Sequence, residues 1–141
     1  MSMEYYAALP GVAVPDFAAW RQALAATGLP VSFKGEFQPS QTSGFCPLNV
    51  DGQASGCEVD FSPDAEPELL GEYPALAEVC GDSAALFSFR WGGDAREAAG
   101  AFALAAALGA FGGVFYDPQE DEVVRDAAEV AGFARDMIAE A

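Results

Sequence analysis

Carboxylates are the side chains of this sequence that offer most scope for chemistry. The chain has 22 Asp and Glu residues and no histidine. The lack of histidine removes the commonest general base, the Ser-His and Cys-His nucleophile pairs and the H-E-x-x-H metal site. The cysteines, Cys46, Cys57 and Cys80, have no CxxC spacing, so we expect buried thiols and no zinc site. The sequence predicts no catalytic residue, no metal and no cofactor.

The carboxylates form local groups, and none has a spacing that specifies a metal ion or a glycosidase pair. Glu58 and Asp60 share one face of an expected strand, while further groups lie in an expected loop and at an expected helix start. The loop group is Asp64, Glu66 and Glu68, and the helix-start group is Glu120, Asp121 and Glu122. Each is typical of a solvated acidic face. Gly92-Gly93 lacks the GxGxxG and P-loop patterns and predicts a tight turn.

The net charge of −16 comes from acids that are spread along the chain, with only six basic residues. A negative field of this kind repels nucleic acid and anionic membranes, so we expect neither as a partner. It also speeds association with basic proteins, although it is equally typical of an acidic protein whose charge serves only solubility. The first residues lack the features of a signal peptide, which predicts a cytoplasmic protein with reduced thiols.

A strand–helix–strand unit is expected to organise the fold. Ala85–Trp91 is a strand-like run, and Asp94 with Glu97 forms a capping box for a helix at about Ala95–Phe111. A second strand follows at Val114–Tyr116. The helix is rich in Ala and Gly and uncharged from Ala98 onward, which we interpret as a fully buried crossover helix rather than a membrane span. Arg90 and Trp91 are expected to be a strand-face ion-pair residue and a core aromatic, with interface residues as the alternative.

The remaining elements complete a single α+β domain over residues 1–141. We expect a helix from Asp16 to Gly28, a strand at Val31–Phe37, and a hairpin formed by Phe45–Val50 and Gly56–Phe61. Two short helical turns follow within residues 69–79, and the chain ends in an amphipathic helix that begins at Glu120–Glu122. Residues 1–14 are a lead-in with room for one short strand or helix. The sum is a mixed sheet of about five strands with helices on one or both faces.

The segment LFSFRWGGDAREAAGAFALAAALGAFGGVFYDPQEDEVV, roughly residues 84–125, resembles small bacterial proteins that carry an RWGG-helix-GGVxYDPQ pattern. These are similar to immunity proteins, the cytosolic antidotes of interbacterial toxins, including effectors of type VI secretion. The resemblance implies a protein that binds a cognate toxin stoichiometrically and blocks its active site or its access to substrate.

The carboxylates are then expected to face basic residues on the toxin. The candidates are Asp64, Glu66 and Glu68 in the loop and Asp117, Glu120, Asp121 and Glu122 near the C-terminal helix. Two other classes stay open. One is a small housekeeping enzyme or ligand-binding domain that uses Glu58 and Asp60, and the other is a DNA-mimic inhibitor with carboxylates along one elongated face.

Overall fold

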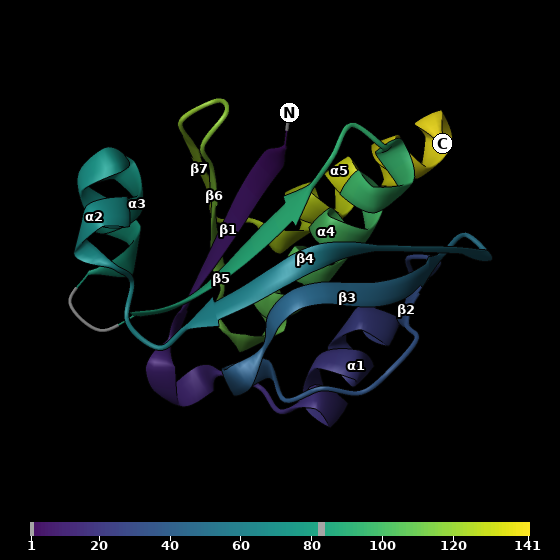
Figure 1. The fold of residues 1–141 in the computed structure, drawn as a ribbon, viewed down its shortest axis with the longest axis horizontal. Coiled ribbons are helices and arrows are strands. Elements are labelled where there is room, and N and C mark those ends of the chain that lie inside the picture. The colour runs from purple at the N-terminus through teal and green to yellow at the C-terminus, as the bar shows by residue number, and fades with distance from the viewer. Residues whose placement is uncertain (1, 82–83) are drawn as a thin grey trace.

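Seven strands of the described residues form one antiparallel sheet in the order β2-β3-β4-β5-β1-β6-β7 (Figure 1). The computed structural model describes residues 2–81 and 84–141. The strands are β1 (Met3–Pro10), β2 (Val31–Phe33), β3 (Ser43–Val50), β4 (Gln53–Ser62), β5 (Ala84–Trp91), β6 (Val114–Asp117) and β7 (Glu122–Val124). The α-helices are α1 (Phe17–Ala26), α2 (Pro67–Glu72), α3 (Pro74–Cys80), α4 (Ala95–Ala107) and α5 (Ala127–Glu140), with 3₁₀ turns at Gly11–Ala13, Pro39–Gln41 and Leu108–Phe111.

The α+β class is confirmed, but the expected mixed sheet of about five strands is wrong. β1 has no firm signal in the sequence, because Tyr5–Leu9 is buried on both faces and therefore shows no alternation of polar and apolar residues. β1 nonetheless lies at the centre and pairs with β5 on one side and β6 on the other. The strands of the crossover unit thus run in the same direction but are separated by an antiparallel strand. β1 and the edge strand β7 are the two strands that the expected sheet of about five lacked.

One face of the sheet is covered by α1, α4 and α5, as expected for a buried crossover helix and an amphipathic C-terminal helix. Trp20 of α1 is fully buried between α4 and the sheet. Its ring centroid lies 5.0 Å from that of Phe87 and 6.4 Å from that of Phe89. Its indole Nε1 donates a hydrogen bond of 3.1 Å to the carbonyl of Leu104. This carbonyl is free because the helix tightens into a 3₁₀ turn at Leu108.

The ends of α4 follow the sequence signals closely. Asp94 is the N-cap, and its Oδ1 accepts from the backbone N–H groups of Arg96 at 2.7 Å and Glu97 at 3.0 Å. Glu97 reaches past the N-cap and accepts from Gly92 N–H at 3.1 Å, which closes the turn between β5 and α4. Gly112 ends the 3₁₀ turn in the left-handed conformation, with φ +84°. No helix in the described part of the chain has both the length and the apolar character needed to cross a membrane.

The opposite face of the sheet is covered only at one end, by the short helices α2 and α3 (Figure 1). Pro74 separates these helices, as the sequence predicts, and Leu76 of α3 is fully buried against the sheet. The expected strand Val31–Phe37 is shorter, because Pro47 of β3 has no N–H to continue the ladder beyond Phe33.

Packing between the 3₁₀ turn at Leu108–Phe111 and α5 gives a test of the helical layer. A Cβ added at Gly109 would lie 2.3 Å from Cβ of Ala127. We expect Gly109→Ala to lower the free energy of unfolding by about 1–3 kcal/mol, since the 3₁₀ turn and α5 must move apart. Urea unfolding measures this value.

The matched control is Gly71→Ala in α2, where an added Cβ meets nothing within 4 Å. It should be neutral or stabilise by up to about 1 kcal/mol. Adding Ala127→Gly to Gly109→Ala should restore part of the loss, seen as a coupling energy in the double-mutant cycle. Equal unfolding energies for Gly109→Ala and Gly71→Ala would contradict the packing.

Candidate functional site

The uncovered part of the sheet is the surface on which polar and charged side chains gather. Strands β4, β5 and β1 send alternate side chains to this face, and the pairing register aligns them in rows. In one row Arg90 of β5 lies opposite Glu58 of β4 and Glu4 of β1. In the next row Ser88 lies opposite Asp60 and Tyr6.

Arg90 is held between two carboxylates. Its Nε lies 3.7 Å from Oε1 of Glu4, and its Nη1 lies 3.7 Å from Oε2 of Glu58. The side chains of Arg90, Glu4 and Glu58 are 45%, 34% and 50% exposed. Each ion pair therefore contributes about 1 kcal/mol at most to stability. The ion-pair role expected for Arg90 is confirmed, and Trp91 is a buried core aromatic as expected. The carboxylates remain open to solvent and to a partner.

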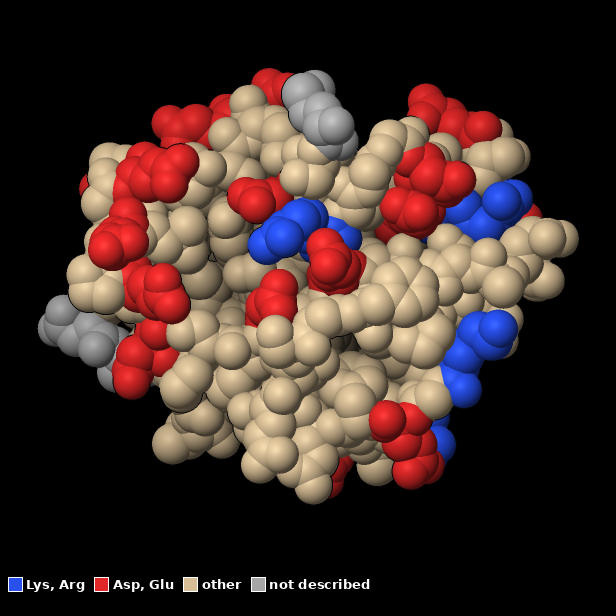
Figure 2. All heavy atoms as spheres, in the orientation of Figure 1, with Lys and Arg blue, Asp and Glu red and all other residues tan. Residues whose placement is uncertain are grey.

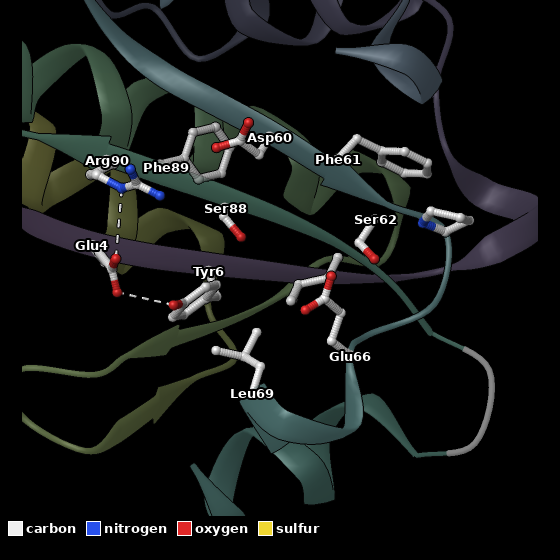
Figure 3. A pocket seen from close by; sticks show the side chains of 12 residues that line it. Glu4, Tyr6, Asp60, Phe61, Ser62, Glu66, Leu69, Ser88, Phe89 and Arg90 are labelled. Carbon is white, nitrogen blue, oxygen red and sulfur yellow. Dashed lines mark hydrogen bonds and ion pairs between the residues drawn. The ribbon is translucent and has the colours of Figure 1, made fainter. Parts of the chain in front are cut away.

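A hollow of about 450 Å³ lies beside this row, between the uncovered sheet face and α2 (Figure 3). β1 contributes Glu4 and Tyr6 to its wall, β4 contributes Asp60, and α2 contributes Leu69. Glu66 lines it from the start of α2. Together with Glu58, the hollow and its rim place four carboxylates against the single guanidinium of Arg90. These five groups carry a net charge of −3.

Acidic residues also dominate the surface around the hollow. In Figure 2, carboxylates crowd the side of the molecule that carries α2 and α3, and others surround a small group of basic atoms near the centre of the view. This arrangement favours a cationic partner by long-range attraction.

The loop residues predicted from sequence are only partly at this hollow. Glu66 lines it, whereas Asp64 and Glu68 are exposed nearby in the connection to α2 and in its first turn. Glu58 and Asp60, the pair expected for an enzyme or ligand-binding domain, are divided in a similar way. Asp60 faces the hollow, and Glu58 lies on the rim with Arg90. The sequence therefore predicted the strand face of Glu58 and Asp60 correctly, but not the wall opposite them.

The predicted helix start at Glu120, Asp121 and Glu122 is wrong. These residues form the turn of the β6–β7 hairpin and the beginning of β7, and α5 begins only at Ala127. Asp121 closes the turn in two ways. Its backbone is left-handed, with φ +49°, and its side chain accepts a hydrogen bond from the Tyr116 hydroxyl. Glu120 and Glu122 are exposed.

Asp117, the remaining predicted contact residue, is used largely within the hairpin. Its Oδ1 accepts from the backbone N–H and from Nε2 of Gln119, at 2.9 and 2.8 Å. Gln119 in turn bridges to β1, accepting from Glu4 N–H and donating to the Glu4 carbonyl, both at 2.9 Å. The hairpin is thereby fixed beside Glu4. Asp117 and Asp121 thus have structural partners, while Glu120 and Glu122 remain available for contact.

Three tyrosines form the apolar floor between the sheet and α3. Tyr6, Tyr73 and Tyr116 have ring centroids 5.7–6.4 Å apart. Burial, followed by the nearby Glu4 carboxylate, raises the pKa of Tyr6, whose hydroxyl donates to Glu4 Oε2 at 3.0 Å. Burial, followed by the hydrogen bond to Asp121, raises the pKa of Tyr116. Both phenols therefore stay neutral and donate to the acidic surface at neutral pH.

The thiols lie away from the uncovered face or beneath it. Cys46 and Cys57 are buried on the helix-covered side and directly opposite one another on β3 and β4. Burial raises the pKa of Cys46 to about 12 and also raises that of Cys57, which leaves neither as a thiolate at neutral pH. Within residues 2–81 and 84–141, no group of three or more Cys, Asp or Glu side chains is arranged to hold a metal ion.

No family model, curated protein or solved structure matches this chain. The site is therefore defined by its own geometry. Glu4, Tyr6 and Gln119 were not predicted from the sequence. Glu4 and Tyr6 lie on β1, which was interpreted as a lead-in, and the Gln119 bridge joins segments 115 residues apart. The sequence feature that could have indicated β1 is the adjacent pair Tyr5 and Tyr6, in an apolar run that ends at Pro10.

The tyrosines give a pH prediction. Because the folded state raises the pKa of Tyr6 and Tyr116 above the ordinary value of 10.0, their contribution to stability is complete below pH 10.0 and is lost as pH rises toward the folded value. We expect the free energy of unfolding to fall above this pH, by up to about 1.4 kcal/mol per pH unit for each tyrosine.

Urea unfolding between about pH 8 and about pH 11 measures the slope, and tyrosinate absorbance reports ionisation. Tyr6→Phe should make the slope shallower. Tyrosinate absorbance that reaches the full value for all four tyrosines near pH 10.0, with the sheet intact by circular dichroism, would contradict the assignment.

Proposed function

We propose that this chain is a cytosolic immunity protein that neutralises a cognate toxin by stoichiometric binding. The observation that carries the proposal is the uncovered sheet face, where Glu4 and Glu58 flank Arg90, and where Asp60 and Glu66 line the adjoining hollow. Such a face complements the basic surface with which a toxin binds an anionic substrate. The toxin's active site, or its path to substrate, is then covered by the bound antidote.

The surface offers three groups of contact residues around one hollow. Glu4, Glu58 and Asp60 lie on the sheet, and Glu66 lies at the start of α2, with Asp64 and Glu68 exposed beside it. Glu120 and Glu122 of the β6–β7 hairpin lie beyond β1, in a turn that Gln119 fixes to β1. The summed charge speeds encounter with a basic toxin, and contacts made at the hollow set the rate of dissociation.

The test uses the product of the neighbouring reading frame as the toxin candidate. We expect its expression alone to stop growth, and co-expression of this chain to restore growth. With purified proteins, inhibition should be complete at a 1:1 ratio. The association rate constant should fall by about tenfold or more between about 50 and about 500 mM salt, because exposed charges are screened.

A matched pair of variants separates the acidic surface from total charge. Asp60→Asn with Glu66→Gln should slow association more than a double change at Asp136 and Glu140, which are exposed on α5. An association rate that does not change with salt would contradict the electrostatic steering. Turnover of a small molecule by the purified chain, abolished by changing one carboxylate, would contradict the proposed function as a whole.

A second candidate is the binding of a small cationic ligand in the same hollow. Its volume of about 450 Å³ is within the range of small-molecule sites, and Asp60, Glu66 and Tyr6 would supply the polar contacts. Thermal-shift measurements with diamines and other small organic cations test this candidate. Stabilisation that saturates and is lost in Asp60→Asn would support it.

A further inference from the structure

Phe45 is an exposed aromatic residue on the uncovered face of the sheet. It is 65% exposed, and in the described part of the chain the only other large hydrophobic residue of this kind is Val12. Phe45 lies on β3 directly opposite Glu58 of β4, which places it on the same face as the Arg90 ion pairs. Aromatic side chains are enriched among the residues that contribute most to binding at interfaces, so an exposed ring beside ion pairs is a candidate anchor.

A glycine makes room for the Phe45 ring. A Cβ added at Gly56 of β4 would lie 2.5 Å from Cζ of Phe45 and 2.5 Å from the carbonyl oxygen of Cys46. The ring therefore lies over bare backbone, at a point where any other residue would displace it. An aromatic side chain has only two side-chain torsions, so it loses little conformational entropy when a partner covers it.

The register extends this anchor into a row of four residues, Phe45, Glu58, Arg90 and Glu4, on β3, β4, β5 and β1. With about 4.8 Å between strands, the row spans about 14 Å. We call these four residues the docking row. It carries two carboxylates and one guanidinium, and its Glu4 end borders the hollow that also holds Asp60 and Glu66.

We propose that the docking row is the contact strip for a basic protein segment that presents an arginine next to an aliphatic or aromatic side chain. The apolar side chain covers Phe45, and the guanidinium binds the open sides of Glu58 and Glu4, with Arg90 keeping the two carboxylates in position. This inference rests on the proposed function, because it names the chemistry of the toxin surface that the immunity protein covers.

Charge decides in favour of this occupant. A second copy of the chain would bring another body of net charge −16 to an acidic face, and nucleic acid would be repelled for the same reason. A purely apolar partner would cover Phe45 but would also desolvate Glu4 and Glu58, whose two negative charges exceed the single positive charge of Arg90. A segment with both a guanidinium and an apolar side chain satisfies both ends of the row.

The test uses two blocked pentapeptides, one of alternating arginine and leucine and one of alternating arginine and glycine, titrated into the isotope-labelled full chain at low salt. Their charge is the same but glycine is the more flexible residue, so the part of the difference that depends on Phe45 reports the apolar contact. We expect the leucine peptide to bind about fivefold more tightly, with chemical-shift changes centred on the docking row. In Phe45→Ser this advantage should disappear, while in Val12→Ser, the matched change at the other exposed apolar residue, it should remain.

The charged end of the row has its own control. Glu58→Gln should weaken both peptides by about fivefold, and Glu140→Gln, the same charge change on α5, should weaken them by less than about twofold. Three results would overturn the docking row: equal affinity for the two peptides, equal effects of Phe45→Ser and Val12→Ser, or no measurable binding of either peptide.

The proposed function can fail separately. If Phe45→Ser neutralises the toxin as strongly as the unchanged chain in the co-expression assay, the docking row is wrong and the immunity function stands. If the peptides show the expected selectivity but no neighbouring toxin is neutralised, the docking row stands as a surface for basic segments and the immunity function is wrong.

Discussion

Unequal coverage of the two faces of the sheet is the constraint on which this structure depends. The strands bury one face completely beneath α1, α4 and α5, where close approach by the small side chains of α4 leaves room for Trp20. Among the described residues, α2 and α3 alone cover the other face. Whatever the sequence places on the remainder must tolerate water, and the charged row around Arg90 meets that requirement.

The central strand connects the fold to the site. β1 separates β5 from β6, pairs with both, and carries Tyr5 toward the helices and Tyr6 toward α3. Its Glu4 completes the ion pairs of Arg90 and is bound through its backbone by Gln119 of the hairpin. One strand therefore joins the core, the hollow and the acidic hairpin, and the site cannot form before distant parts of the chain have assembled.

Local signals were sufficient for the elements whose causes are local. Asp94 and Gly112 predicted the ends of the crossover helix region, and the alternation of Cys57, Glu58 and Val59 predicted a half-buried strand. The central place of β1 depends on pairing across more than 70 residues with β5 and more than 100 with β6, which no local pattern encodes. The acidity of the surface was predictable from composition, but the hollow was not. Its wall depends on α2 lying beside β1, which is distant in sequence, and the place of the Phe45 ring depends on Gly56 in the neighbouring strand.

The central claim is that the uncovered sheet face is the functional surface, and carboxyl footprinting of a purified complex tests it most directly. A carbodiimide labels exposed carboxylates, and mass spectrometry compares the free chain with the chain bound to the proposed toxin partner. We expect strong protection of Glu4, Glu58 and Asp60, with unchanged labelling of Asp136 and Glu140 on α5. Protection confined to α5, with the three sheet carboxylates labelled as in the free chain, would contradict it.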